Sequence, residues 1–367
     1  MRKRKSSGRN WYFYLDYKLF VLILFLMGVG IFAILDVSIP KAIETFSDKF
    51  YFVKQQSLWM VVGLFVFLVA SQIDTRLWKK LAVFLFAISV IFLIVVLIPQ
   101  AGLKVLGARR WLDLGLLSFQ PSEFAKIALC VYLAKVSEVK KNVFSFILPI
   151  AVTVGLVMLQ PDLGTSVVLI IIAFAQIFMS EINLMKVFIV FFGGVILISL
   201  LIFSSQYRRE RVTAFLNPFS KSDDTSYHIK QVLYSLAWGG VGGTGIGQST
   251  QKYLFVPEVT TDSIFAIISE ETGFLGSAIL IILYALVSLR MIKLISGIDG
   301  DFQKSLGVGI FAWFTGQVFV NLSSISSLIP FTGVPLPFIS YGGSTLVSIL
   351  LAFGIFNSIL KYSTSHD

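Results

Sequence analysis

The sequence predicts an all-α membrane protein with ten transmembrane helices. Hydrophobic residues make up 56% of the 367 positions, and charged residues make up only 14%, against roughly a quarter in soluble domains. The apolar residues fall into repeated stretches of about 20, the length of helix that crosses a hydrocarbon core. The strands of a membrane β-barrel are about half as long and alternate polar with apolar residues, a pattern that these stretches lack.

Ten stretches of span length can be placed along the chain, between a basic tail at 1–18 and a short tail at 362–367. The predicted spans cover residues 19–38, 56–73, 79–99, 121–137, 143–160, 163–180, 186–204, 263–289, 304–327 and 340–360. They form one membrane domain over 19–361. No small-residue cleavage pattern follows the first stretch, so we interpret it as a retained span rather than a signal peptide.

Basic residues orient these spans. They gather in the N-terminal tail and in the short loops near 76–80, 135–141 and 290–293, and short cytoplasmic loops are the ones enriched in lysine and arginine. The pattern predicts both termini in the cytoplasm and the long loop 205–262, between spans 7 and 8, on the outer face. The opposite orientation would place that loop in the cytoplasm.

The formal net charge of +10 does not indicate a nucleic-acid-binding protein. Basic residues lie at span ends, and no basic stripe interleaved with aromatic residues marks a soluble domain. One cysteine, Cys130, and two histidines, His228 and His366, are too few for a disulfide framework or a metal centre built on those residues. The function classes that remain are those of proteins embedded in a membrane.

A cluster of cations follows the third span. Arg109, Arg110 and Trp111 lie within GARRWLDLG, and Lys126 lies one turn inside the next span, three residues after Glu123. Snorkelling arginines and an interfacial tryptophan would explain the first three separately. A charge below the membrane surface is costly and indicates function by default. Guanidinium and ammonium groups at an interface suit a lipid-linked diphosphate.

Acids mark the starts of two spans. Asp162 follows Pro161 before the sixth span, where helix capping explains it. Asp262 precedes the eighth span, and capping by Thr261 or Asp262 explains that position too. Capping does not cover Glu270 and Glu271, which a continuous helix would place about 12 Å further along, below the interface. We interpret them as paired structural acids, with Lys126 or an arginine as candidate partners.

Two further segments on the outer face are unlike linkers. Residues 227–238 have the pattern of an amphipathic helix on the membrane surface. The following GGVGGTGIG lacks the GK[ST] of a phosphate loop and predicts tight turns. PFTGVPLPFISYGGS, residues 330–344, carries three prolines and three glycines. Such a segment breaks a helix and, at membrane depth, must line a cavity or be buried in protein, so it predicts a re-entrant segment before span 10.

These features together predict a membrane-level site on the outer face, with cations, a carboxylate at a span start and irregular backbone. Two function classes fit the site. One is an enzyme acting on a lipid-linked anionic substrate, and the other is a transporter or flippase that carries such a lipid.

Six motifs taken together carry a family resemblance. In chain order they are GARRWLDLGLLSFQPSEFAK, QPDLGTS, YRRERVTAFLNP, QVLYSLAWGGVGGTGIGQSTQKYLFVPE, TDSIFAIISEETGFLG and PLPFISYGGS. They resemble the SEDS family of bacterial peptidoglycan glycosyltransferases (RodA, FtsW and SpoVE) over essentially the whole chain, and the stretch around GGVGGTGIG is more similar to the FtsW and SpoVE branch. Thr260 stands where the family usually has histidine, and Thr272 where it usually has leucine, while Asp262 is retained.

The resemblance implies polymerisation of lipid II into glycan strands at the outer face of a bacterial cytoplasmic membrane, with release of undecaprenyl diphosphate. Asp262 would then be the catalytic base. The substrate-binding residues implied are Arg109, Arg110, Trp111, Lys126, Asp162, Arg208, Arg211, Ser340, Tyr341 and Gly342. The acids Glu123, Glu258, Glu270 and Glu271 are interpreted as structural groups. Mg²⁺ or Mn²⁺ is a candidate helper at the diphosphate, and no organic cofactor is expected.

The resemblance also implies partners. The family works with a class B penicillin-binding protein, a transpeptidase, and with other divisome or elongasome proteins. Division, elongation and sporulation roles stay open at this point. Two alternatives to the enzyme also stay open: a lipid II flippase, which needs no base at the outer face, and a non-catalytic scaffold for a penicillin-binding protein.

Overall fold

The structure of the protein is a computed structural model. It describes residues 15–105, 108–113, 115, 118–139, 143–180, 185, 192–194, 212–213, 215–216, 224–253 and 259–363. The predicted seventh span, 186–204, lies almost entirely outside the described residues, as do Arg208, Arg211 and Glu258.

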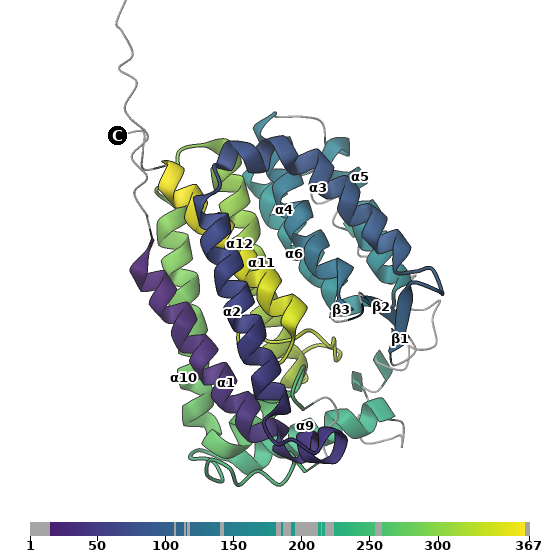
Figure 1. The fold of residues 1–367 in the computed structure, drawn as a ribbon, viewed down its shortest axis with the longest axis vertical. Coiled ribbons are helices and arrows are strands. Elements are labelled where there is room, and N and C mark those ends of the chain that lie inside the picture. Colours follow the sequence, from purple (N-terminus) through teal and green to yellow (C-terminus); the bar gives the residue numbers. More distant parts are fainter. Residues whose placement is uncertain are drawn as a thin grey trace, which may run out of the picture.

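Long apolar helices dominate the described residues (Figure 1). The helices are α1 (Tyr17–Phe46), α2 (Tyr51–Gln72), α3 (Thr75–Val95), α4 (Pro121–Glu138), α5 (Phe144–Leu159), α6 (Leu163–Met179), α9 (Asp224–Gly239), α10 (Ile264–Ile295), α11 (Asp301–Ile325) and α12 (Gly343–Ser363). Six of them, α1, α2, α3, α10, α11 and α12, are long and apolar enough to cross a membrane, and α5 and α6 are shorter apolar helices. The fold is therefore that of a helical, multi-pass membrane protein.

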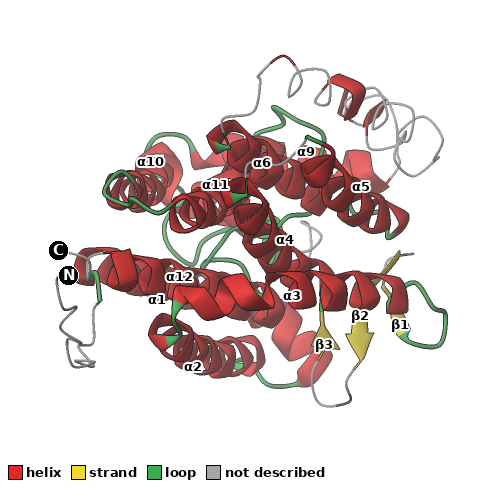
Figure 2. Ribbon diagram, turned by 90° about the horizontal axis from the view of Figure 1, so that it is seen from above, coloured by secondary structure: helices red, strands yellow, loops and turns green. Residues whose placement is uncertain are grey.

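The helices differ in how deeply they are buried, and this separates the centre of the bundle from its rim. The apolar windows of α11 and α12 are 72% and 78% buried, against 22% for α2 and α3. α4 packs against α3, α6 and α11, and α12 packs against α2 (Figure 2). Large apolar side chains such as Phe65, Phe84 and Phe319 are exposed on the rim, as expected where lipid surrounds the protein.

A small antiparallel sheet, which the all-α prediction missed, follows α3. Its strands are β1 (Gly102–Val105), β2 (Ala108–Asp113) and β3 (Ser118–Phe119), in the order β1-β2-β3. Ser344 at the start of α12 donates a hydrogen bond to the Ser118 carbonyl at 3.1 Å. The sheet therefore lies beside the N-terminus of α12, at the end of the bundle that also carries α9 (Figure 1). We call this the site end.

The eighth predicted span is not one continuous helix. Gly273 inside α10 has φ 66° and ψ −164°, a conformation that is essentially restricted to glycine. It separates a short stretch, 264–272, from a stretch of span length, 274–295, which is about 33 Å long. Glu270 and Glu271 therefore end the first stretch, before the part of α10 that is long enough to span a bilayer.

Ion pairs beside α1 show where Glu270 and Glu271 lie along the axis of that helix. Arg290 donates through Nε to Asp16 at 3.1 Å near one end of the helix pair. Lys252 bridges Asp36 of α1 and Glu271 near the other end. Asp16 and Asp36 are twenty residues apart, about 30 Å of helix, which matches the thickness of a hydrocarbon core. The continuous helix that was expected to carry Glu270 and Glu271 inward is therefore interrupted just after them, at Gly273.

Candidate functional site

Asp262 lies in a short irregular segment at the site end, directly before α10. Its side chain is largely buried. The N-cap residue of α10 is Ser263, and it forms no side-chain cap hydrogen bond, so the predicted capping by Thr261 or Asp262 does not explain the acid.

The backbone around Asp262 is held at three successive carbonyls. The Asp262 carbonyl accepts from Asn321 Nδ2 at 3.0 Å. The Thr261 carbonyl accepts from the Ser340 hydroxyl, and the Thr260 carbonyl accepts from the Tyr341 amide at 2.9 Å. Three bonds on consecutive residues fix the course of the main chain from which the Asp262 side chain projects.

The segment between α11 and α12 is irregular and largely buried, as its prolines and glycines predicted. Its polar main-chain groups are satisfied by side chains from neighbouring helices, which is the condition for irregular backbone at membrane depth. Gln317 and Asn321 of α11 donate to the carbonyls of Pro335 and Val334 at 2.9 and 2.7 Å. Gln56 of α2 donates to the Ser340 carbonyl and accepts from the Gly342 amide at 3.3 and 3.2 Å.

Lys126 lies inside the bundle and is paired there. Its side chain is 1% exposed, and its ammonium donates to Glu123 at 2.8 Å and to Gln317 at 2.9 Å. It also lies 4.8 Å from the centroid of the Trp313 ring. The second carboxylate oxygen of Glu123 is buried and has no hydrogen-bond partner among the described residues. Because Gln317 also bonds to Pro335, Lys126 is linked through one side chain to the irregular segment.

The two arginines of β2 point in opposite directions, because successive side chains of a strand alternate between faces. Arg110 donates through Nε to the Gln160 carbonyl at 3.1 Å and through Nη2 to the Pro161 carbonyl. Arg109 instead lines a cavity of about 650 Å³ with α3 and β1 side chains, including Ile91 and Phe92. The two guanidinium groups therefore belong to different surfaces of the sheet.

Asp162 lies next to the carbonyls that Arg110 contacts. It is the N-cap of α6 and accepts from the amide and the hydroxyl of Thr165 at 3.0 and 2.8 Å, so the predicted cap is confirmed. Gly164 packs so closely against Thr332 and Val334 that an added Cβ would lie 2.2 Å from a Val334 methyl group. The N-terminus of α6, with Arg110 beside it, thus borders the segment between α11 and α12, which also bonds to the backbone next to Asp262.

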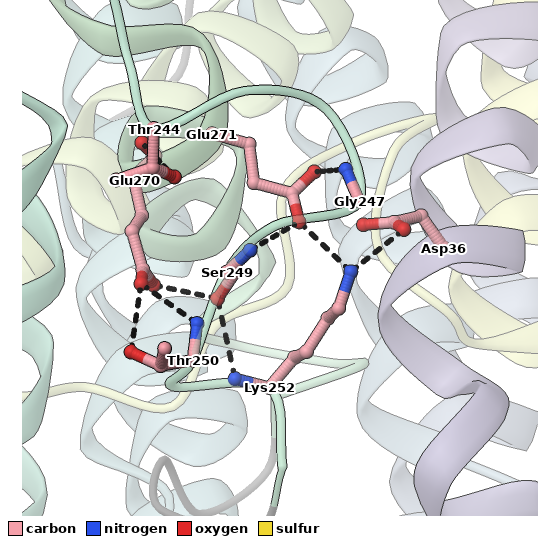
Figure 3. Close-up of polar contacts among 8 residues, drawn as sticks. All are labelled: Asp36, Thr244, Gly247, Ser249, Thr250, Lys252, Glu270 and Glu271. Carbon is pink, nitrogen blue, oxygen red and sulfur yellow. Dashed lines mark hydrogen bonds and ion pairs between the residues drawn. The ribbon is translucent and has the colours of Figure 1, made fainter.

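Glu270 and Glu271 form no contact with Lys126 or with an arginine in the described part of the chain. Glu271 pairs with Lys252 at 2.9 Å, and Glu270 accepts from the Ser249 hydroxyl at 2.6 Å (Figure 3). The interpretation of Glu271 as a paired acid holds, but both candidate partners were wrong. Glu270 is stabilised by hydrogen bonds from a serine and a threonine instead.

Sequence reasoning missed several polar residues that build the site. His228 of α9 is not among the predicted site residues, yet its Nε2 lies 2.7 Å from the hydroxyl of Ser263, and its ring packs on Phe331. Gln317 and Asn321 are also absent from the prediction, although they are amides inside an otherwise apolar stretch. Polar residues within spans are functional candidates by default, so that signal was present.

Comparisons with known proteins identify the family. The family described as "Cell cycle protein", FTSW_RODA_SPOVE, matches residues 17–365. The chain belongs to the FtsW, RodA and SpoVE family. It is 36% identical over 358 residues to "Stage V sporulation protein E" of Bacillus subtilis (strain 168), covering 95% of this chain and 97% of that protein. It is 37% identical over 352 residues to "Probable peptidoglycan glycosyltransferase FtsW" of Pasteurella multocida (strain Pm70), covering 93% and 89%.

Solved structures support the same family fold. One chain, from the work described as "Structural coordination of polymerization and crosslinking by a peptidoglycan synthase complex", matches with a TM-score of 0.79 and 26% identity, over 96% of this chain and 99% of that one. The crystal structure of the rod shape determining protein RodA of Thermus thermophilus matches with a TM-score of 0.73 and 25% identity, with the same coverage. The SEDS resemblance carried by the six motifs is thus confirmed.

The described residues of this SEDS chain contain no group of three or more His, Cys, Asp or Glu side chains that could hold a metal ion.

Proposed function

We propose that this chain polymerises lipid II into glycan strands at the outer face of the bacterial cytoplasmic membrane, releasing undecaprenyl diphosphate. The chain is a peptidoglycan glycosyltransferase of the SEDS family: relatives matched over nine-tenths of its length carry that activity in their names. The observation that carries the mechanism is a buried aspartate, Asp262, whose own carbonyl and the two before it are each held by a hydrogen bond.

Asp262 is assigned as the general base. The 4-hydroxyl of the acceptor GlcNAc attacks the anomeric carbon of the donor MurNAc, and the bond from that carbon to the diphosphate oxygen breaks. Asp262 takes the hydroxyl proton, and the diphosphate leaves with the electron pair of the broken bond. Because the hydroxyl attacks opposite the leaving group in a single displacement, the anomeric carbon is inverted. A positioned carboxylate that removes this proton contributes typically about 10²–10⁴-fold to the rate.

The departing diphosphate needs fixed positive charge, and Arg110 is the assigned group. Arginine has five N–H donors in a rigid fork, and the carbonyls of Gln160 and Pro161 engage only the Nε and Nη2 groups. Lys126 is assigned an indirect part, since its ammonium is buried between Glu123 and Gln317. Further substrate contacts are proposed for a set of residues on the sheet, α6, the long loop and the irregular segment: Arg109, Trp111, Asp162, Arg208, Arg211, Ser340, Tyr341 and Gly342.

The proposed setting is a ten-span protein with both termini in the cytoplasm and the site end on the outer face. A penicillin-binding protein is the proposed partner. One structural relative was solved in work on "polymerization and crosslinking by a peptidoglycan synthase complex", which supports a partner that performs the crosslinking. Lipid II as substrate and a class B transpeptidase as the specific partner rest on the family resemblance, as do other divisome or elongasome proteins.

Replacing Asp262 by asparagine tests the mechanism. Asparagine is nearly isosteric but accepts no proton, so Asp262→Asn should lower polymer formation from purified lipid II in detergent by about 100-fold or more. Gel analysis of the glycan product measures the rate, while thermal unfolding and lipid II binding, both expected to be unchanged, serve as controls.

The same assay separates the alternatives. Polymerisation by Asp262→Asn at the wild-type rate would remove Asp262 as the base. A flippase would move lipid II between vesicle leaflets without forming polymer, and it would do so equally well with asparagine at 262. A scaffold would give no polymer even when the wild-type chain is mixed with its transpeptidase.

A further inference from the structure

Four charged side chains from three parts of the chain meet at the site end beside α1 (Figure 3). Lys252 lies between two acids: its ammonium is 2.8 Å from Asp36 Oδ1 and 2.9 Å from Glu271 Oε1. The side chains of Lys252 and Glu271 are only 5% and 6% exposed. Glu270, the fourth member, lies next to Glu271 at the end of the first stretch of α10. The mechanism proposed above uses none of these residues.

The two glutamates bind the segment 244–253, which we call the strap. Glu271 accepts from the amides of Gly247 and Ser249 at 3.0 and 3.1 Å. Glu270 accepts from the Ser249 hydroxyl at 2.6 Å and the Thr250 amide at 3.0 Å. Hydrogen bonds to a carboxylate are roughly twice as strong as neutral ones, so the strap is fastened by its own backbone to two anions.

Main-chain bonds reinforce the same junction. The amides of Thr244 and Gly245 donate to the carbonyls of Glu270 and Glu271 at 2.9 and 3.1 Å. Beyond the kink, the amides of Phe274 and Leu275 donate to carbonyls of the turn just before the strap, at 2.9 and 3.2 Å. The strap and the turn before it therefore occupy the backbone groups that the kink at Gly273 releases from the helix.

The order of these segments along the chain relates the cluster to Asp262. The strap ends nine residues before Asp262, and the stretch 264–272 begins two residues after it. The cluster therefore joins the two elements that flank the segment carrying Asp262, the strap and the stretch 264–272. Asn321, Ser340 and the Tyr341 amide hold that segment on its other side. Joining the ends of a loop removes much of its conformational freedom, and a displacement of about 1 Å costs a catalytic group roughly 100-fold in rate.

We propose that Lys252, Glu270 and Glu271 form a clamp that positions Asp262, and that Asp36 ties this clamp to α1. Lys252 is the positioning residue on which the clamp depends, because it is the cation between the buried Glu271 and the partly buried Asp36. Without it, Asp36 and Glu271 are left close together with no cation between them, and the strap loses its link to α1. The proposal rests on the assignment of Asp262 as the base.

The same two helices supply a matched control. Arg290 of α10 pairs with Asp16 at the start of α1, about 30 Å from the clamp and out of reach of the strap. Lys252→Met and Arg290→Met each remove the cation from a partly buried ion pair between α1 and the rest of the protein. Only the first change touches the clamp.

The experiment compares these variants in steady-state polymerisation of lipid II and in hydrogen exchange, each as the full chain in detergent. Lys252→Met is expected to lower kcat by about 10- to 100-fold while the KM for lipid II stays within about threefold. Lys252→Arg, which keeps the charge, should recover most of the rate. Arg290→Met should lower the melting temperature but leave kcat of the folded protein unchanged. Exchange at 244–253 and 259–272 should rise in Lys252→Met and not in Arg290→Met.

Other results would overturn the clamp. A wild-type kcat in Lys252→Met, or an equal loss of kcat in Arg290→Met, would show that the cluster acts only on stability. A raised KM at unchanged kcat would place Lys252 in substrate binding instead. If Lys252→Met does not fold, Ser249→Ala replaces it as the test, because it removes one hydrogen bond to Glu270 and keeps all charges. A wild-type kcat in Ser249→Ala, together with raised exchange at 244–253, would count against the clamp. If Asp262→Asn stays active, the base assignment fails, while exchange at 259–263 in Lys252→Met still decides whether the clamp orders this segment.

Discussion

The Lys126 ammonium occupies a position where an isolated charge would be very costly. It is buried among α4 and α11 side chains, and Glu123, Gln317 and the Trp313 ring surround it. Removing one partner of a buried ion pair leaves the other charge uncompensated, at a cost of about 3–5 kcal/mol. The structure thus gives Lys126 a direct role in stability, whatever it contributes to substrate binding.

Replacing Lys126 by methionine should therefore destabilise the fold by about 3–5 kcal/mol, measured by thermal unfolding in detergent. The double variant Lys126→Met, Glu123→Gln should recover much of that loss, because the glutamine is neutral. Lys54→Met is the matched control: Lys54 pairs with Asp48 at 2.7 Å, but its side chain is 67% exposed, so its melting temperature should match the wild type. An unchanged melting temperature in Lys126→Met would mean that the pair serves the substrate alone.

The same residue marks the reach of sequence reasoning at this scale. The spacing of Glu123 and Lys126 on one helical face predicts their contact. Gln317 lies 191 residues away, and its contact with Lys126 depends on the packing of α11 against α4. The ion pair of Glu271 with Lys252 was missed for a similar reason: it forms only because the strap folds back over a kink that hydropathy does not reveal.

At the scale of elements, hydropathy located the helices well and their interruptions poorly. Nine of the ten predicted spans overlap described helices, because a bilayer-length apolar run is a strong signal. The strands between α3 and α4 were missed because each is only two to six residues long. The break in α10 was missed because Gly273 looks like an ordinary helical glycine in the sequence, and only its contacts with the turn before the strap require its conformation.

Gly273→Ala tests that break. Alanine does not adopt φ 66°, ψ −164° without strain, and its Cβ would lie 2.3 Å from the Gly243 nitrogen. The variant should lose about 3 kcal/mol or more of stability and should expose the strap to proteolysis. Gly28→Ala is the control, since Gly28 lies inside α1 with no atom within 4 Å of an added Cβ, and alanine there should be neutral or stabilising by about 0.5–1 kcal/mol. Equal melting temperatures for the two variants would contradict the kink.

At the scale of the whole molecule, α1 is fixed at two points about 30 Å apart along its axis. At one end Asp16 accepts from Arg290 of α10, and its amide donates to Asn357 of α12 at 3.3 Å. At the second point, well before the helix ends at Phe46, Asp36 accepts from Lys252. The first helix thus connects the clamp beside Asp262 to helices at the opposite end of the bundle. Substitutions at the Asp16–Arg290 pair should therefore change mainly stability, and substitutions at the Lys252 clamp should change catalysis.

The pH dependence of stability tests the ion pair of Asp16 with Arg290, which lies far from the site. Burial raises the pKa of Asp16, but hydrogen bonds from Arg290 and from the Leu19 amide outweigh it and lower that pKa below its ordinary value of 3.8. A group whose pKa is lowered on folding stabilises the fold above its unfolded pKa, and the contribution is lost as the pH falls through the folded pKa.

Asp16→Asn keeps a good helix cap but loses the charge, so at pH 7 it should be less stable than the wild type by about 1.5–3 kcal/mol. Unfolding in detergent from pH 7 down to pH 3 should show this gap closing below about pH 4, as the wild-type carboxyl takes up its proton. The kcat of the folded variant at pH 7 should equal that of the wild type, and a gap in stability that stays constant with pH would remove the Asp16 charge as its source.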